Sequence, residues 1–341
     1  MKLMLLIFLI LIINSCDRRE NRMPDEFIVE NRNRSIGTGI NLGNALEAPH
    51  EGEWGLTIDE RYIDSIREAG FNSVRIPICW SCHTNSEYPY EIDKTFLTRI
   101  DQVVGWCNDR DLVAIITIHH FNELYDYPDN STYRNMFFSI WQQLSEHYKK
   151  TDCEKLIFEP LNEPHNNLTS DKWNKLIPEI LQVIRSVDSN RTLILDVPDY
   201  GYHHSITKLS IPADEKNIIV SVRYYLPYEF THQGAHWAQG SDKWLGTAWT
   251  GTTSQKNTVI TDMDFIKTWA EENHRPVTIG EWGSIIYCDS TSRLVWTEFV
   301  RRQIEEQGFS STYFDFGVLF RAYDLENDHW LNGFKEALLV D

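Results

Sequence analysis

Two glutamates stand out because each follows a short apolar run that is typical of a buried strand. Glu163 follows the run at 156–159 within an Asn-Glu-Pro sequence, and Glu281 follows the run at 277–279. Glycoside hydrolysis requires two such carboxyl groups, since one protonates the leaving oxygen and the other acts as nucleophile or base. On its own, Glu163 also fits an acidic residue that caps a helix. The pair predicts a catalytic centre if the fold brings both residues to one place.

The ends of the other predicted strands carry further polar residues that suit the same chemistry. They are Arg75, His119, His120, Asn162, Arg223 and Tyr225. Asn162 is placed to hold a sugar 2-hydroxyl, a contact that strengthens in the transition state. Tyr225 is placed to donate to the nucleophile, and Arg75 to keep Glu281 ionised, because an opposite charge favours the charged form. Alone, Arg75 also fits a surface cation and His119 a buried histidine.

The histidines and cysteines do not predict a metal site. His119 and His120 are adjacent and lack the i, i+4 spacing that places two ligands on one helix face. Cys79 and Cys82 form a single C-x-x-C pair, which favours a buried or bonded pair over zinc. Five cysteines follow Cys16, an odd number that does not indicate a disulfide framework. We expect neither metal nor cofactor, since this hydrolysis needs only carboxyl groups and water.

Short apolar runs alternate with longer helical patterns from Ile36 onward, and these elements must position the polar residues. The predicted strands are 38–41, 73–76, 113–118, 156–159, 192–196, 218–224, 277–279 and 312–316. The predicted helices are 59–69, 95–108, 133–148, 171–188, 263–273 and 292–307. Gly70 and Gly308 are well placed to end the helices before them.

Repeated strand–helix units predict a parallel sheet with crossover helices. The eight strands, with no linker between them, predict an α/β fold, a single-domain (β/α)8 barrel over residues 36–341. The competing fold is a doubly wound open sheet, but no G-x-G-x-x-G sequence follows the first strand. In a (β/α)8 barrel the C-terminal ends of the strands meet at one face, where the polar residues are therefore expected.

The composition narrows the class of protein. The 341 residues include 32 Lys+Arg and 50 Asp+Glu, for a net charge of −18, which argues against binding to a nucleic-acid backbone. With 42% hydrophobic and 24% charged residues the chain is globular in composition. The 12 Trp, 15 Tyr and 16 Phe fit an aromatic core, or a cleft whose flat apolar faces pack against sugar rings. Composition alone does not choose between them.

The first 16 residues have the pattern of a bacterial export signal. Lys2 gives a short positive region, and residues 3–13 form an apolar run too short to span a bilayer comfortably. The run ends in Ile-Asn-Ser-Cys, which resembles a lipobox with Cys16 as the lipid-bearing residue. A plain signal peptide with an incidental cysteine is the alternative. Residues 17–35, rich in charge and Asn, are predicted to form a flexible tether.

The chain resembles glycoside hydrolase family 5, which holds many cellulases and mannanases, from about Ile36 to the C-terminus. The resemblance lies in GINLGNALEAPHEGEWG (39–55), GFNSVRIPICW (70–80), ITIHHFNEL (116–124), LIFEPLNEPHNNLT (156–169), YEFTHQGAHW (228–237) and VTIGEWG (277–283). Asn-Glu-Pro at the fourth strand together with a second Glu at the seventh is specific to this superfamily. The resemblance implies a (β/α)8 barrel and a retaining mechanism, with Glu163 as acid/base and Glu281 as nucleophile.

The resemblance also implies the supporting residues. Arg75, His119, Asn162 and Tyr225 hold their usual places. The positions that line the sugar cleft in similar endoglucanases, some of which accept mannan, are matched by Asn44, Glu47, His120, His232 and Trp237.

Two positions depart from the family. Phe314 stands where Trp normally forms the platform under the sugar at the cleaved bond, and Phe is smaller and lacks the indole N–H. Arg223 stands where His is usual, and Arg is longer and always charged. Two hypotheses follow for Arg223. Its charge either tunes the pKa of the catalytic carboxyls, or pairs with a carboxylate on an acidic sugar.

The sequence therefore predicts a secreted β-glycanase, most simply an endo-β-1,4-glucanase that acts on plant-type polysaccharide with retention. Alternatives on the same fold are a β-mannanase, a xyloglucanase and a mixed-linkage glucanase. A non-catalytic carbohydrate-binding relative is the rival from another class, because Arg223 and Phe314 both touch the innermost subsite. We expect a monomer that does not bind nucleic acid and contacts a membrane only through lipid on Cys16, at the periplasm or the cell surface.

Overall fold

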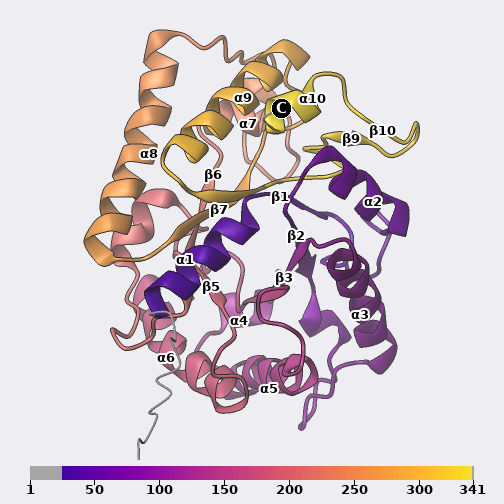
Figure 1. Ribbon diagram of the computed structural model, residues 1–341, viewed down its shortest axis with the longest axis vertical. Helices are drawn as coiled ribbons and strands as arrows, with labels where there is room; N and C mark the ends of the chain where they lie inside the picture. Colours follow the sequence, from indigo (N-terminus) through magenta and orange to yellow (C-terminus); the bar gives the residue numbers. More distant parts are fainter. Residues whose placement is uncertain (1–24, 340–341) are drawn as a thin grey trace, which may run out of the picture.

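The structure, a computed structural model, describes residues 25–339 as a closed barrel of parallel strands surrounded by helices (Figure 1). The barrel strands are β1 (Thr38–Asn41), β2 (Ser73–Ile78), β3 (Val113–Ile118), β4 (Leu156–Glu159), β5 (Leu193–Asp196), β6 (Ile218–Tyr224), β7 (Val277–Trp282) and β8 (Ser310–Tyr313). Each strand pairs with its neighbours in chain order, and β1 closes the barrel on β8. The predicted (β/α)8 barrel is confirmed.

Helices surround the barrel. The long outer helices are α2 (Glu60–Ala69), α3 (Lys94–Asp109), α5 (Ser131–Tyr148), α6 (Ser170–Val187), α8 (Thr253–Asn273) and α9 (Ser290–Glu306). Shorter elements are α4 (Asn122–Asp126), α7 (Tyr228–Thr231), α10 (Phe334–Leu338), the 3₁₀ helices η1 (Trp80–His83), η2 (His203–Lys208) and η3 (Ser241–Trp244), and a hairpin of β9 (Tyr323–Asp324) and β10 (His329–Trp330). Between β5 and β6 the six-residue η2 stands in place of a full crossover helix.

Local sequence explains where the helices begin and end. Asp59 caps α2 by accepting from the Arg61 N–H, and Gly70 ends it with φ 111°, a left-handed conformation that favours glycine. Helix α8 begins well before the predicted start at 263, because Thr252 and Gln255 form a capping box. The polar first turns of α8 hide this start from a search based on apolar periodicity.

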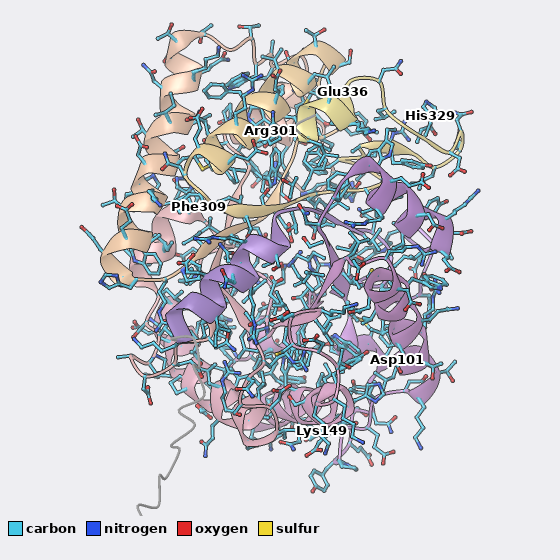
Figure 2. The ribbon with its side chains drawn as sticks, viewed as in Figure 1. Asp101, Lys149, Arg301, Phe309, His329 and Glu336 are labelled. Atoms are coloured by element: carbon cyan, nitrogen blue, oxygen red, sulfur yellow. A yellow bond between two sulfur atoms is a disulfide. The ribbon has the colours of Figure 1, made fainter. Side chains whose placement is uncertain are left out.

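Apolar side chains fill the space between the barrel and the helices, and polar ones cover the outside. The side chains of Trp80, Trp141, Trp173, Trp249, Trp282 and Trp296 are fully buried. Asp101 on α3, Lys149 at the end of α5 and Glu336 on α10 lie on the outer surface (Figure 2). Four more of the 12 tryptophans, Trp106, Trp244, Trp269 and Trp330, are partly buried and pack against the same core. Most of the tryptophans thus belong to the core, and only a minority is left for a cleft.

Helix α1 (Asp25–Ile36) corrects the prediction of a flexible tether over residues 17–35, since the later part of that segment is helical. Arg32 donates to Thr192 Oγ1 at 2.6 Å, and Asn33 donates to the Val277 carbonyl at 3.2 Å, so α1 is bound to the N-terminal ends of the barrel strands. The polar residues of this segment indicated solvent exposure, but the strand starts offer them partners. The predicted signal, Cys16 and residues 17–24 lie outside the described residues.

The same contacts explain why β8 covers Ser310–Tyr313 and not the predicted 312–316. Ser310 faces the barrel interior, where its hydroxyl donates to Asn33 Oδ1 at 2.8 Å. A strand that begins with two serines lacks the apolar signal used to find it. Among the described residues, no helix combines the length and the apolar character needed to cross a bilayer.

Part of the N-terminal half of the barrel interior, on the side of β3 to β6, is filled by apolar side chains. Val29 and Ile36 of α1 pack there against inward-facing strand residues, which are Val113, Ile115, Ile157, Ile194 and Ile219. We call this cluster the lower layer. It leaves the C-terminal half of the interior for polar groups.

Candidate active site

The two predicted catalytic glutamates converge at the C-terminal ends of the strands. Nε of Arg223, on β6, lies 3.3 Å from Glu163 Oε1 and 3.5 Å from Glu281 Oε1. Because one nitrogen reaches both, these oxygens are less than about 7 Å apart, close to the ~5–5.5 Å of retaining enzymes and at the lower limit of the ~6.5–9.5 Å of inverting ones. The geometry favours a retaining arrangement.

A bulge in β7 places Glu281 beside Arg223. Val222 pairs with Ile279 and Arg223 pairs with Glu281, so Gly280 is an extra residue in β7. A Cβ atom on Gly280 would collide with the Arg223 guanidinium and with the Ser221 hydroxyl. Only glycine therefore fits at this position.

The backbone of Glu163 is fixed by the barrel. Its N–H donates to Asp196 Oδ2 at 2.8 Å, and its φ of 44° lies in the left-handed region that non-glycine residues seldom adopt. The hydroxyl of Tyr125 donates to the carbonyl of the preceding Asn162 at 2.6 Å. The loop after β4 thus presents Glu163 in one conformation.

Buried charged residues form a hydrogen-bonded network that we call the upper layer. Its members are Arg75, Arg223, Glu159, Asp196 and Glu281. Arg75 donates to both oxygens of Glu159, at 2.6 and 2.7 Å, and to Glu281 Oε1 at 2.7 Å. Arg223 donates to Asp196 Oδ2 at 2.6 Å and to Glu159 Oε1 at 3.1 Å. Buried charges are tolerated here because each has partners of opposite sign.

The network gives the two predicted catalytic carboxyls, those of Glu163 and Glu281, different surroundings. Burial raises the pKa of Glu163 to about 8, and the negative charge of Glu281 adds to this, while Arg223 opposes it. Glu163 therefore keeps its proton near neutral pH, as a general acid must. Glu281 instead accepts hydrogen bonds from Arg75 and, at 3.0 Å, from the Tyr225 hydroxyl.

The side chain of Asn162 is oriented by the same arginines. Its Oδ1 accepts from Arg75 at 2.8 Å and from Arg223 at 2.6 Å. Since the oxygen is held by two donors, the NH₂ group is the side of the amide that a substrate hydroxyl can meet. The contact between Asn162 and a sugar 2-hydroxyl stays a prediction.

Arg223 itself is buried, with an exposed fraction of 4%. One terminal nitrogen donates to Ser221 Oγ at 2.6 Å, and the other contacts Glu159, Asn162 and Asp196. Because both terminal nitrogens are engaged, the arrangement supports tuning of the carboxyls and not the recognition of an acidic sugar.

The three predicted histidines are held in neutral form. Burial lowers the pKa of His120 to about 4 and that of His232 to about 3, and the pKa of the buried His119 lies well below its usual range. Nδ1 of His119 is buried and has no hydrogen-bond partner among the described residues.

Exposed aromatic rings flank these residues. Tyr228, 39% exposed, stacks on His232 at 4.1 Å, and Trp237, 49% exposed, meets the edge of the same ring. Trp54, 40% exposed, packs edge-on against His120 at 5.6 Å. Such faces suit the apolar side of sugar rings. Tyr228 and Trp54 were not predicted, although both lie within stretches that carry the family resemblance.

The loop after β1 holds the remaining predicted positions. Glu47 is buried and accepts from the backbone N–H groups of Ala45, at 2.8 Å, and of Asn44, while burial raises its pKa to about 8. Asn44 donates to Asp315 Oδ2 at 2.8 Å. Glu47 thus holds the loop together. Phe314, next to Asp315, packs against Gly43, where a Cβ atom would lie 2.7 Å from its ring.

Sequence reasoning missed Glu159 and Asp196. Each is an acidic residue at the end of an otherwise apolar strand, two positions after an isoleucine of the lower layer. Because side chains alternate along a strand, residues two apart face the same side, and this signal places both acids inside the barrel. The Cys79–Cys82 pair forms a disulfide, in agreement with the bonded interpretation.

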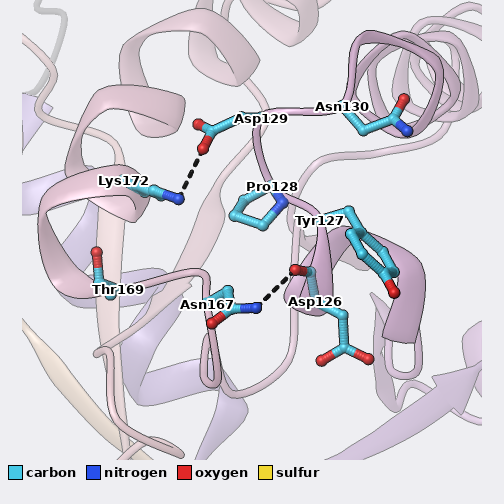
Figure 3. A pocket seen from close by; sticks show the side chains of 8 residues that line it. All are labelled: Asp126, Tyr127, Pro128, Asp129, Asn130, Asn167, Thr169 and Lys172. Carbon is cyan, nitrogen blue, oxygen red and sulfur yellow. Dashed lines mark hydrogen bonds and ion pairs between the residues drawn. The ribbon is translucent and has the colours of Figure 1, made fainter.

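A pocket of about 430 Å³ lies between the segments that follow β3 and β4 (Figure 3). Lys172 pairs with Asp129 at 2.7 Å across it, and Asn167 donates to the Asp126 carbonyl at 2.8 Å. None of the predicted site residues lines this pocket. Its polar groups are engaged in holding the two segments together.

Comparison with known proteins agrees with this geometry. Residues 36–318 match the sequence profile of Cellulase (glycosyl hydrolase family 5). The chain is 39% identical over 296 residues to Endoglucanase H of Acetivibrio thermocellus, covering 86% of this chain and 31% of that protein. It is 28% identical to Cellulase/esterase CelE of the same organism, covering 88% of this chain and 38% of that protein. The chain thus spans about a third of the length of these two relatives.

Among solved structures, the chain is similar to Cel5A of Thermotoga maritima. The TM-score is 0.88 with 44% sequence identity, over 91% of this chain and 99% of that one. That protein is described in complex with mannotriose and in complex with cellobiose.

Proposed function

The chain belongs to glycoside hydrolase family 5, and from this premise we propose that it is an endo-β-1,4-glucanase that acts with retention. The observation that carries the proposal is the approach of Arg223 Nε to within 3.5 Å of both Glu163 and Glu281. That spacing leaves room for one glycosidic bond between an acid and a nucleophile, without the extra water that inversion requires.

The roles follow from the charge states of the two residues. Glu281 attacks the anomeric carbon while Glu163 gives its proton to the leaving oxygen, so that the glycosidic bond breaks as the bond to Glu281 forms. Glu163, then ionised, takes a proton from the water that attacks the same carbon and releases Glu281. Arg75 and Tyr225 hold the nucleophile in place throughout.

Action within a polysaccharide chain is supported by the exposed rings of Trp54, Tyr228 and Trp237, which offer faces for several sugar units. The relatives named above are endoglucanases or cellulases, which supports β-1,4-glucan as substrate. Mannan is the second candidate, because the similar Thermotoga maritima Cel5A has been solved with mannotriose as well as with cellobiose.

The proposal is tested by reducing-sugar release from carboxymethylcellulose, mixed-linkage glucan, xyloglucan and mannan, with Glu281→Ala as the blank. We expect release from β-1,4-glucan with a rapid fall in viscosity, as internal cleavage produces. Higher release from mannan would reassign the substrate. Glycan binding with no release above the blank would support the non-catalytic alternative.

We also propose that the protein is exported and anchored by lipid on Cys16. The support is the sequence pattern at residues 1–16. The wild type should fractionate with membranes, and Cys16→Ala should change that fractionation. A soluble wild type cleaved elsewhere in this segment would contradict the anchor.

A further inference from the structure

A second group of chemically competent side chains lies where η2 meets α8, outside the network around the catalytic glutamates. It consists of His203 and His204 on η2 and Asp262 on α8. One ligand atom from each of the three lies within 4.8 Å of the other two. This is the one group of three or more His, Cys, Asp or Glu residues within the described part of the chain that comes this close.

The distances fit a tetrahedral metal site. With metal–ligand bonds of about 2.0–2.2 Å, neighbouring ligand atoms lie about 3.3–3.6 Å apart. Nε2 of His203 is 3.4 Å from Asp262 Oδ1, and Nε2 of His204 is 3.9 Å from the same oxygen. The side chain of His204 is half-exposed, so its ring is free to move the few tenths of an ångström that would bring its Nε2 to the required distance from Asp262 Oδ1.

A buried side chain without partners gives independent support for a ligand. His203 is fully buried, and neither of its ring nitrogens has a hydrogen-bond partner among the described residues. Buried polar groups are rarely left in this state, since nothing replaces their lost hydration. Its Nε2 lies near the same oxygen of Asp262 that His204 approaches, without forming a hydrogen bond to it.

Neighbouring residues orient the Asp262 carboxylate, as the neighbours of a metal ligand do. The hydroxyl of Tyr224 donates to Asp262 Oδ2 at 2.9 Å, which leaves Oδ1 facing the histidines. The rings of Tyr202 and Phe265 pack against the imidazoles of His203 and His204, at 4.7 and 4.6 Å. Partners that fix the ligands from outside are a regular feature of metal sites.

We propose that His203, His204 and Asp262 bind one divalent transition-metal ion of the zinc class. Two imidazoles and one carboxylate suit zinc and its neighbours, whereas Mg²⁺ and Ca²⁺ prefer sites built from oxygen. Three protein ligands leave the fourth position to water. The hydrolysis does not use this ion, because Glu163 and Glu281 carry the chemistry.

The place of the site in the fold indicates what the ion does. It ties η2, the short substitute for a crossover helix, to α8. Two residues before His203, the Gly201 carbonyl accepts from the Arg223 N–H at 2.7 Å, so the clamped segment also supports the strand that carries Arg223. The metal thus stabilises the loop after β5 against the barrel.

The test is a zinc titration of the metal-free full chain, followed by competition with a coloured zinc chelator and by the thermal unfolding midpoint. We expect one equivalent of zinc to bind and to raise the midpoint, and Mg²⁺ or Ca²⁺ to do neither. His204→Ala, at a half-exposed position that tolerates truncation, should weaken zinc binding by at least about tenfold. Asp262→Asn, which keeps the shape of the side chain, should weaken it as well.

His329→Ala is the matched control, because His329 is an exposed histidine on β10, on the far side of the molecule from α8 (Figure 2). It should bind zinc like the wild type. The proposal is overturned if the wild type takes up no stoichiometric zinc, or if His204→Ala and Asp262→Asn bind it as tightly as His329→Ala does. None of these measurements uses glycan hydrolysis, so the outcome is independent of the proposed activity.

Discussion

The lower and upper layers of the barrel interior share strands β4, β5 and β6 and have opposite chemistry. On β4, Ile157 belongs to the lower layer and Glu159, two residues later, to the upper layer. On β5, Ile194 and Asp196 are related in the same way. Residues two apart on a strand face the same side, so a rise of about 7 Å along the barrel separates a hydrocarbon environment from a charged one.

The difference separates residues that stabilise the fold from residues of the proposed active site. The lower layer is closed by α1 and gains stability from apolar area removed from water. In the upper layer Arg75 and Arg223 are shared among several carboxylates, so each group depends on the others. A change there affects the charge and the position of Glu163 and Glu281 together.

The largest effect should come from the upper layer. Glu281→Ala removes the group that forms the covalent intermediate, and turnover should fall by roughly 10⁴-fold or more on every substrate. Glu163→Ala should retain partial activity on an aryl glycoside whose leaving group needs no proton, with azide restoring the slow second step. Steady-state rates on both substrate types check this. If both variants lose the same activity on both substrate types, whatever the leaving group, the roles are misassigned.

A charge placed in the lower layer should destabilise the fold, because no partner of opposite sign is available there. Ile157→Glu buries a carboxyl without a partner, and the free energy of unfolding should fall by about 4 kcal/mol or more. Denaturant unfolding measures the loss. Val295→Glu, at an exposed position on α9, is the control and should change stability by less than about 0.5 kcal/mol. A fully stable Ile157→Glu variant would show that the lower layer admits water.

A smaller effect should sharpen the role of α1. Val29→Ala removes apolar contacts from the buried face of α1, and should cost about 1–2 kcal/mol of stability while kcat stays unchanged. Val295→Ala provides the comparison at an exposed site. If Val29→Ala has no effect on unfolding, α1 is not docked on the barrel in solution.

The smallest expected effect is a shift in the pH–rate profile. The positive charge of Arg223 opposes the raised pKa of Glu163, so Arg223→His should raise this pKa further. The alkaline limb reports loss of the acid's proton, and it should move to higher pH by roughly one unit. Arg223→Lys keeps the charge and should leave the limb near that of the wild type. A shift to lower pH in Arg223→His would contradict the tuning role.

Local sequence was sufficient to predict the barrel strands and most of the outer helices. Strands β3, β4 and β6 have the predicted bounds, because apolar runs bounded by polar residues can be recognised without knowing their neighbours. Asp59 caps the start of α2 and Gly70 caps its end, both through contacts within the helix itself. The two glutamates could be found for the same reason, since each follows a recognisable strand and the fold class brings strand ends together.

The docking of α1 and the protonation of Glu163 could not be predicted from local sequence, because both depend on residues that are distant in the chain. Asn33 of α1 bonds to Ser310, and no local pattern distinguishes a docked polar helix from a tether. Burial and the negative charge of Glu281 keep Glu163 protonated near neutral pH, against the opposing charge of Arg223. Arg75 and Tyr225, from other parts of the chain, donate hydrogen bonds to Glu281. Sequence supplies the residue type, but a carboxyl takes its charge state from its burial and from the charges around it, which the closed barrel sets.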